Sequence, residues 1–220
     1  MTRSMPSMRA ALLALAIAGS ALVTPSAVAQ GSGAAAPPRN EQHQPQGKNP
    51  DADRATLVAI FEQLGKASTA SADFVEIRTL GELDMPIESR GQLRFEPPAT
   101  LIKQTTQPVQ ETLRLSGDSL SVTMGDTTRE LPLEAVPAAA ALATALRGLL
   151  AGRLAEVEEQ FTTRFEGDRQ DWQLQLEPRD AKVAASMKKL VVHGLAAQIV
   201  QIDLRQTNGD GSMLRILNTP

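Results

Sequence analysis

The chain has 220 residues, with 22 Lys plus Arg against 25 Asp plus Glu, and its hydrophobic content of 42% is mostly aliphatic because aromatics make up only 3%. It contains no Cys, which excludes disulfides, thiolate metal sites, iron–sulfur clusters and a lipid-modified cysteine. Two His residues are too few for a multi-histidine metal site, and the net charge of −3 lacks the basic footprint of a nucleic-acid binder.

The first 29 residues have the pattern of a cleavable signal peptide. Arg3 and Arg9 precede an apolar run over residues 10–23, which is shorter than a comfortable bilayer span. Ala27 and Ala29 then fit a small-residue cleavage site. A retained anchor helix is the alternative, but the run is short for it. We therefore expect export to the periplasm with no stable membrane insertion.

Residues 30–48 are rich in Gly, Pro, Gln and Ala without apolar periodicity, which predicts a disordered tether. A single domain is expected over residues 49–220. Its first helix is predicted to begin at Asn49-Pro50-Asp51 and to stop at Gly65. One apolar face of this helix is formed, at helical spacing, by Leu57, Ile60, Phe61 and Leu64.

Apolar and polar residues alternate with period two from residue 71 onward, which predicts antiparallel strands. A helix from Pro137 to about Gly152 interrupts them, and strands then resume up to residue 218. The last two strands flank a strong hairpin signal over residues 207–211. We count eleven strands and two main helices. This pattern predicts an α+β fold, an incomplete antiparallel β-barrel whose open concave face is covered by helices.

Residues for catalysis are not found in the sequence. It contains no nucleophile-elbow, zinc-protease, phosphate-loop or dinucleotide motif. His193 could serve Ser116 as a base, but no third group is evident to orient it. Glu156, Glu158 and Glu159 fit solvated charges at a helix end. We therefore predict no catalytic residue, no metal site and no cofactor.

The second helix allows two interpretations. Its leucines fall on one face, at Leu142, Leu146, Leu149 and Leu150. They are either ordinary core, which is the commoner role of an apolar helix face, or a removable lid over a cavity. Periodicity alone does not separate the two.

The segment from Gly91 to Pro108 resembles the periplasmic lipoprotein carriers of the LolA-like family. In that family a Gly-x-Leu strand is followed by Pro seven residues after the Gly, an apolar position and a second Pro. Here Pro98 and Leu101 stand at the first Pro and the apolar position. The order of signal peptide, tether, helices and strands is also similar, as is the late strand Trp172 to Pro178, so the resemblance covers roughly residues 51–218.

This resemblance implies a carrier whose apolar interior receives the acyl chains of a lipoprotein or another lipid on the way from inner to outer membrane. It also implies loading by an inner-membrane transporter complex and unloading to an outer-membrane acceptor. These carriers place a lid-holding Arg just before the first Pro, where this chain has Pro97. The residues expected to line the lipid-binding cavity are Leu93, Phe95, Leu101, Leu113, Leu115, Leu142, Leu146, Leu149 and Leu150.

A second hypothesis keeps the same fold but changes its role. Similar domains occur in stress-signalling regulators, so the chain could be a periplasmic sensor that binds a membrane partner or a lipidated ligand. The carrier hypothesis is favoured because the exported, cysteine-free chain contains the carrier-like segment 91–108. Such a carrier is useful because an acyl chain of about fifteen methylenes costs roughly 12 kcal/mol to expose to water.

Overall fold

The computed structural model describes residues 50–66 and 70–217, so the predicted signal peptide and tether lie outside the described residues. Its helices are α2 (Pro50–Leu64), α3 (Pro137–Leu150), α4 (Leu154–Gln160) and α5 (Ala181–Ala184), with a short 3-10 turn over Leu133–Ala135. Its strands are β1 (Ala70–Thr79), β2 (Ile87–Glu96), β3 (Thr100–Gln107), β4 (Glu111–Ser116), β5 (Ser119–Met124), β6 (Thr127–Pro132), β7 (Phe161–Gly167), β8 (Asp171–Pro178), β9 (Met187–Leu195), β10 (Gln198–Gln206) and β11 (Gly211–Leu217).

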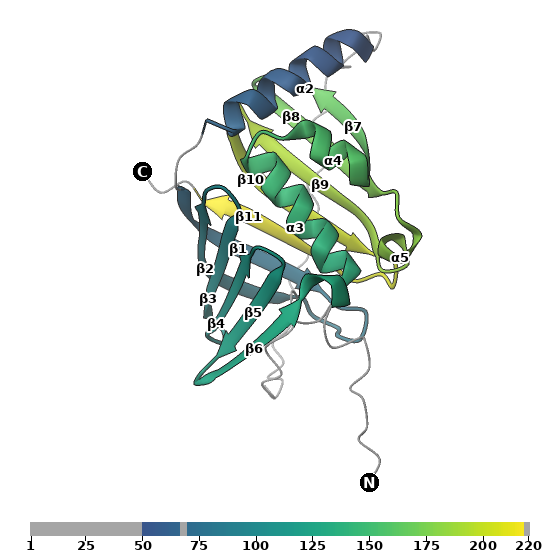
Figure 1. Cartoon of the computed structure of the whole chain (residues 1–220). Helices are drawn as coiled ribbons and strands as arrows, with labels where there is room; N and C mark the ends of the chain where they lie inside the picture. The colour runs from purple at the N-terminus through teal and green to yellow at the C-terminus, as the bar shows by residue number, and fades with distance from the viewer. Residues whose placement is uncertain (1–49, 67–69, 218–220) are drawn as a thin grey trace, which may run out of the picture.

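All eleven strands belong to one antiparallel sheet in the order β6-β5-β4-β3-β2-β1-β11-β10-β9-β8-β7. Strand β1 lies at its centre, between β2 and the last strand β11. Within the described strands β6 and β7 do not pair with each other, so the curved sheet is left unclosed. Figure 1 shows α3 lying across the concave side. The expected fold, an incomplete antiparallel barrel of eleven strands with helices on its open concave face, is confirmed.

The two main helices form where the sequence predicts them. Helix α2 begins at Pro50 and carries Asp51 and Asp53 in its first turn, where carboxylates complement the helix dipole. All four predicted face residues of α2 are buried. A Cβ at Gly152, after the end of α3, would lie 2.6 Å from the Phe61 carbonyl oxygen. Glycine therefore allows the carboxyl ends of α2 and α3 to meet closely.

Two short helices, α4 and α5, were not predicted from the sequence. Helix α4 buries Leu154 and Val157 one turn apart, while the acidic residues between and after them hide this pattern in the sequence. Glu158 does more than face solvent, since its carboxylate forms a bidentate ion pair with the guanidinium of Arg54 on α2. Helix α5 is capped by Asp180, whose carboxylate accepts hydrogen bonds from the backbone of Lys182 and Val183.

The main core lies under strands β7 to β10, a region that we call the filled half of the molecule. The ring of Trp172 is buried there, and its Nε1 donates to the carbonyl oxygen of Ala196 at 2.9 Å. Gly194 leaves room for this ring, because a Cβ there would lie 2.0 Å from it. Helices α2, α3 and α4 cover these strands, and the fully buried strand residues include Phe161, Leu174, Leu176, Leu190 and Val192.

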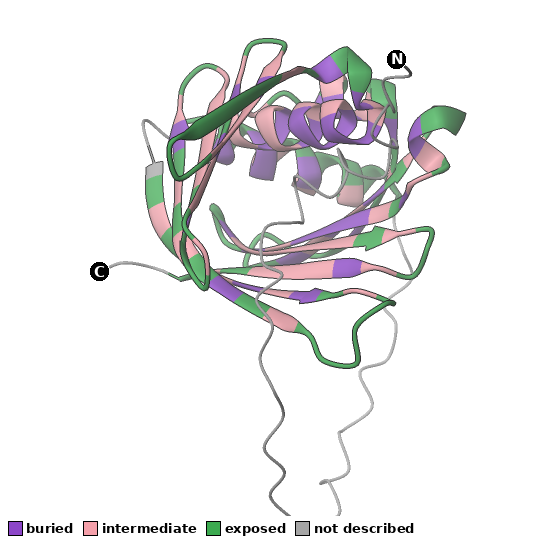
Figure 2. Cartoon of the chain, turned by 90° about the horizontal axis from the view of Figure 1, so that it is seen from below, coloured by how far each residue is buried: buried purple, intermediate pink, exposed green. Residues whose placement is uncertain are grey.

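Strands β1 to β5 form the hollow half, which curves away from the core toward α3. In the view from below the sheet curves round the helices, on which buried residues are concentrated (Figure 2). A register shift lies between Arg90 and Gly91, and a Cβ at Gly91 would lie 1.9 Å from the Gln104 carbonyl oxygen. Such a bulge increases strand twist, so glycine at this position supports the curvature. None of the helices within 50–66 and 70–217 combines the length and apolar character needed to cross a bilayer.

Candidate functional site: an apolar cavity under helix α3

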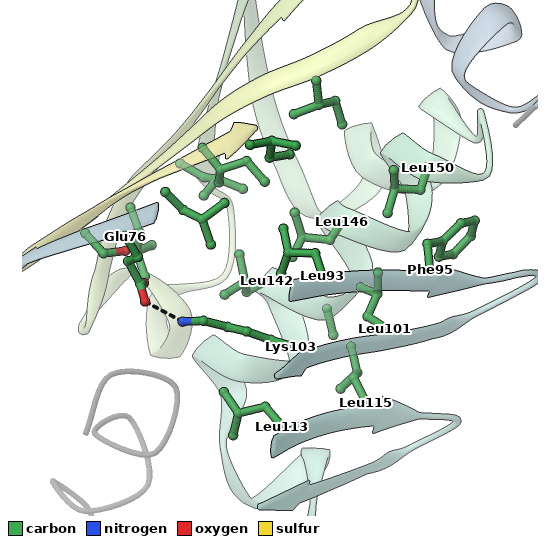
Figure 3. Close-up of a pocket in the computed structure, with 18 of the residues that line it drawn as sticks. Glu76, Leu93, Phe95, Leu101, Lys103, Leu113, Leu115, Leu142, Leu146 and Leu150 are labelled. Atoms are coloured by element: carbon green, nitrogen blue, oxygen red, sulfur yellow. Dashed lines mark hydrogen bonds and ion pairs between the residues drawn. The ribbon is translucent and has the colours of Figure 1, made fainter. Parts of the chain in front are cut away.

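A cavity of about 540 Å³ lies between α3 and the concave face of the sheet. This volume is in the range of about 300–1000 Å³ that is typical of small-molecule sites. Side chains of α3 and of strands β2 to β4 point into it from facing sides (Figure 3). Most of its lining is aliphatic, so its walls offer hydrocarbon contacts and few hydrogen bonds.

The roof of the cavity is supplied by α3. Leu142, Leu146 and Leu150 follow one another at intervals of four residues and therefore lie along one side of the helix. Small residues beside them, Ala139 and Ala143, also line the cavity. Another side of α3 packs in the main core, where Ala145 is fully buried.

The opposite wall is set by strand register. Phe95 on β2, Leu101 on β3 and Leu115 on β4 are cross-strand partners in one row. Leu93, Lys103 and Leu113 form the next row in the same way. Cross-strand partners share one face of a sheet, so both rows face α3.

Eight of the nine residues expected to line a lipid-binding cavity surround this one; their contact with a lipid stays a prediction. They are Leu93, Phe95, Leu101, Leu113, Leu115, Leu142, Leu146 and Leu150. Leu149 is not among the lining residues and is fully buried in the main core. Seven residues after Leu142, it is rotated by about 20° toward the core side of the helix, while Leu146 and Leu150 are rotated the other way.

Sequence reasoning missed the third wall, which is built by β9, β10 and β11. The spacing of its side chains departs from period two at the register shifts of β10, and nothing local in the sequence indicated that these strands face the cavity. The residues are Met187, Leu190, Ile199, Ile202, Leu204, Leu214 and Ile216.

Charged side chains that the sequence reasoning also missed interrupt this apolar lining, among them a largely buried pair. Lys103 Nζ forms an ion pair with Glu76 Oε2, and both side chains are largely shielded from solvent (Figure 3). Ser89 Oγ also donates to Glu76, at 3.3 Å, and the ammonium of Lys103 lies 5.2 Å from the centre of the Phe74 ring. Lys103 follows Leu101 in the same phase of β3, which was the available signal in the sequence.

Further charges lie beside this pair. Arg78 is 7% exposed, and its Nε has no hydrogen-bond partner among the described residues. The Oε2 atom of Glu111 is likewise buried without a partner in that part of the chain. Burial raises the pKa of Glu111, while Lys103 and Arg78 act to lower it and Glu76 acts to raise it.

Arg147 joins α3 to the hollow half. Its Nε donates to the Ala99 carbonyl oxygen at 2.8 Å and its Nη2 to that of Gly117 at 2.7 Å. Partial burial lowers the pKa of Arg147, against the opposing effect of Asp118. Arg147 of the helix therefore holds α3 to the hollow half. Its acceptor Ala99 lies two residues after Pro97, the position at which the carriers have their lid-holding Arg.

Other polar groups stand apart from the cavity. His193 Nε2 lies 3.2 Å from Asp203 Oδ2, but Ser116 is on β4, which is not a neighbour of β9 in the sheet. Ser116 instead shares a hydrogen bond with Thr100. No group of three or more potential metal ligands occurs within residues 50–66 and 70–217.

Comparison with solved structures found distant fold relatives. A LolA superfamily protein from Nitrosomonas europaea is 13% identical, with 74% of this chain and 92% of that chain covered and a TM-score of 0.40. The MucA/MucB complex of Pseudomonas aeruginosa is 13% identical, with 76% of this chain and 55% of that chain covered and a TM-score of 0.42. The lipoprotein LppX of Mycobacterium tuberculosis is 11% identical, with 76% of this chain and 97% of that chain covered and a TM-score of 0.36. Among curated protein sequences, none matches this chain.

Comparison with protein families gives the assignment. The sequence profile described as outer membrane lipoprotein carrier protein LolA-like matches residues 50–217, which include the whole sheet and all four helices. The family is one of binding and carrier folds, which agrees with an apolar cavity as the main feature of the concave face. This chain belongs to the LolA-like family of outer-membrane lipoprotein carrier proteins.

Proposed function

We propose that this protein is a periplasmic carrier that shields the acyl chains of a lipoprotein or another lipid during transfer from the inner to the outer membrane. The observation that carries the proposal is the apolar cavity of about 540 Å³ between α3 and the sheet. An inner-membrane transporter complex would supply the cargo and an outer-membrane acceptor would receive it. The signal peptide expected over residues 1–29 supports this location.

The physical chemistry of the cavity supports a carrier. Each methylene kept out of water contributes about 0.8 kcal/mol, so a single chain needs an enclosure rather than an exposed groove. Leucine walls supply that burial with little polar recognition. The ordinary close packing of a protein interior would exclude a chain, whereas the hollow half leaves space for one.

Displacement of a fluorescent fatty acid tests the proposal, with Leu146→Gln as the variant because Leu146 lines the cavity. A buried amide without a partner costs about 1–3 kcal/mol, so we expect the affinity to fall about ten-fold or more. Val58→Gln is the matched control, since Val58 is an exposed apolar residue of helix α2.

Mass spectrometry of lipids that copurify with the wild-type protein identifies the natural cargo class. Failure of the folded wild-type protein to bind any acyl ligand would contradict the proposal. Equal weakening in Leu146→Gln and Val58→Gln would contradict the assignment of the site.

A further inference from the structure

The cavity has a polar end whose position follows from the strand register. Phe95, Leu101 and Leu115 form an apolar row, and two rows further along the same strands Thr105 stands opposite Gly91 and Glu111. The charged residues Glu76, Arg78, Lys103 and Glu111, which we call the charged cluster, gather at and beside this end. Hydrocarbon contacts and charges are therefore separated along the strands.

Burying charges is unfavourable unless each is paired and hydrogen-bonded. Here the pairing is incomplete among the described residues. Glu76 Oε2 accepts from both Lys103 and Ser89, whereas the Nε of Arg78 and the Oε2 of Glu111 have no partner there. A cluster that were purely structural would be expected to satisfy these atoms.

The cluster has unused hydrogen-bond donors. The ammonium of Lys103 has three protons, and Glu76 is the partner seen for it. The buried Nε–H of Arg78 has no acceptor in the described part of the chain. Burial raises the pKa of Glu111, while Lys103 and Arg78 act to lower it. Lys103 and Arg78 therefore bring two cations with unused hydrogen-bond donors to this end of the cavity, which suits an anionic group.

We propose that the charged cluster binds the acidic head group, carboxylate or phosphate, of a single-chain lipid whose hydrocarbon tail lies between α3 and strands β2 to β4. This inference rests on the proposed function and narrows its cargo. Lys103 contacts the head group, because its side chain lines the cavity together with Glu76. Arg78 supplies a second positive charge beside it. Leu113, the neighbour of Lys103 across the strands, begins the apolar path of the tail.

The test compares amphiphiles with the same tail and different heads. The assay measures how well hexadecanoic acid, hexadecyl phosphate and methyl hexadecanoate displace the neutral dye Nile red from the full chain. A charge-assisted hydrogen bond predicts that the wild-type protein binds at least one acidic ligand about ten-fold more tightly than the ester. The two acidic ligands distinguish a carboxylate site from a phosphate site.

Lys103→Met keeps most of the apolar stem and removes the charge. We expect it to weaken binding of the acidic ligand more than binding of the ester, so that the preference for the acid is lost. The matched control is Lys189→Met, because Lys189 Nζ is also part-buried and hydrogen-bonded to Gln175, on the face of the sheet turned away from the core. Glu76→Gln frees the ammonium of Lys103 from its carboxylate, so this variant is expected to bind the acidic ligand at least as tightly as the wild type.

Equal affinity of the wild type for acid and ester would overturn the head-group site while leaving the carrier function intact. So would weakening of both ligands alike by Lys103→Met, or loss of acid binding in folded Glu76→Gln. If none of the three amphiphiles displaces the dye from folded protein, the carrier function itself fails.

Discussion

The two halves of the sheet use the same aliphatic residues in different ways. In the filled half, Leu174, Leu176 and Val192 have no exposed surface and are enclosed by helices. In the hollow half, Leu93 and Leu101 remain partly accessible because they face the cavity instead of a packed layer. Four of the six aromatic residues belong to the filled core, at Phe61, Phe161, Phe165 and Trp172. Most of the bulky rings fill one half, whereas leucines together with Phe95 line a space in the other.

Helix α3 packs in both halves, so a movement of the whole helix as a lid would also disturb the filled half. Its Leu146 and Leu150 line the cavity, whereas Ala145 and Leu149 are fully buried in the filled core. Swinging the whole helix away would expose that core to water, at a cost proportional to the apolar area uncovered. The comparison therefore favours a roof that is anchored on one side by the core and held on the other by Arg147.

The largest expected contrast is in the cost of truncating a leucine in each half. Leu176→Ala removes a fully buried side chain from the filled core and should lower the free energy of unfolding by about 2–5 kcal/mol. Leu113→Ala removes a cavity-lining side chain, which has fewer neighbours to lose, so we expect a loss at or below the lower end of that range. Urea unfolding of both variants measures the difference.

Ligand binding should give the reverse order. Leu113→Ala is expected to alter acyl-ligand affinity, while folded Leu176→Ala keeps the wild-type affinity, because Leu176 is not among the cavity-lining residues. An equal loss of stability at the two positions would mean that the hollow half is as tightly packed as the filled half. That result would contradict the comparison.

Much of the fold could be predicted from the sequence, and the reasons are local. Period-two alternation identified the strands, and the spacing of Leu142, Leu146 and Leu150 identified a helix face. The same spacing could not separate Leu149 from its neighbours, because a rotation of about 20° decides whether a side chain meets core or cavity. The charged cluster was missed because Glu76 and Lys103 are 27 residues apart, and only the register of β1, β2 and β3 brings them together.

A smaller effect is expected from Arg147→Gln, which weakens the link between α3 and the hollow half without touching the core. Loss of hydrogen bonds from a partly exposed guanidinium should lower the free energy of unfolding by about 1–2 kcal/mol. Hydrogen exchange should become faster in the α3 segment near Leu146 and in the loop at Ala99. Arg153→Gln is the control, because Arg153 forms an exposed ion pair with Glu156. Equal exchange in the two variants would show that Arg147 does not hold the roof.

The smallest effect concerns pH and Glu111, at the polar end of the hollow half. Burial raises the pKa of this carboxyl in the folded state above its unfolded value, so the folded protein binds the proton more tightly. Its contribution to stability is therefore fully present below the unfolded pKa and is lost as the pH rises through the folded pKa. Glu111→Gln carries no titrating group at this position and escapes that loss. We expect its advantage over the wild type in free energy of unfolding to grow from about pH 4 to about pH 7.

Thermal unfolding of both proteins across this pH range measures that advantage, and Glu130→Gln on the exposed strand β6 controls for the loss of one carboxylate at the surface. An advantage that shrinks with rising pH would mean that Lys103 and Arg78, which lower the pKa of Glu111, outweigh burial. In that case Glu111 is ionised and paired in the folded protein, the charged cluster carries no net positive charge, and the polar end of the hollow half is a closed ion-pair network. The sign of this pH dependence therefore decides whether the hollow half contains unpaired charges as well as unfilled space.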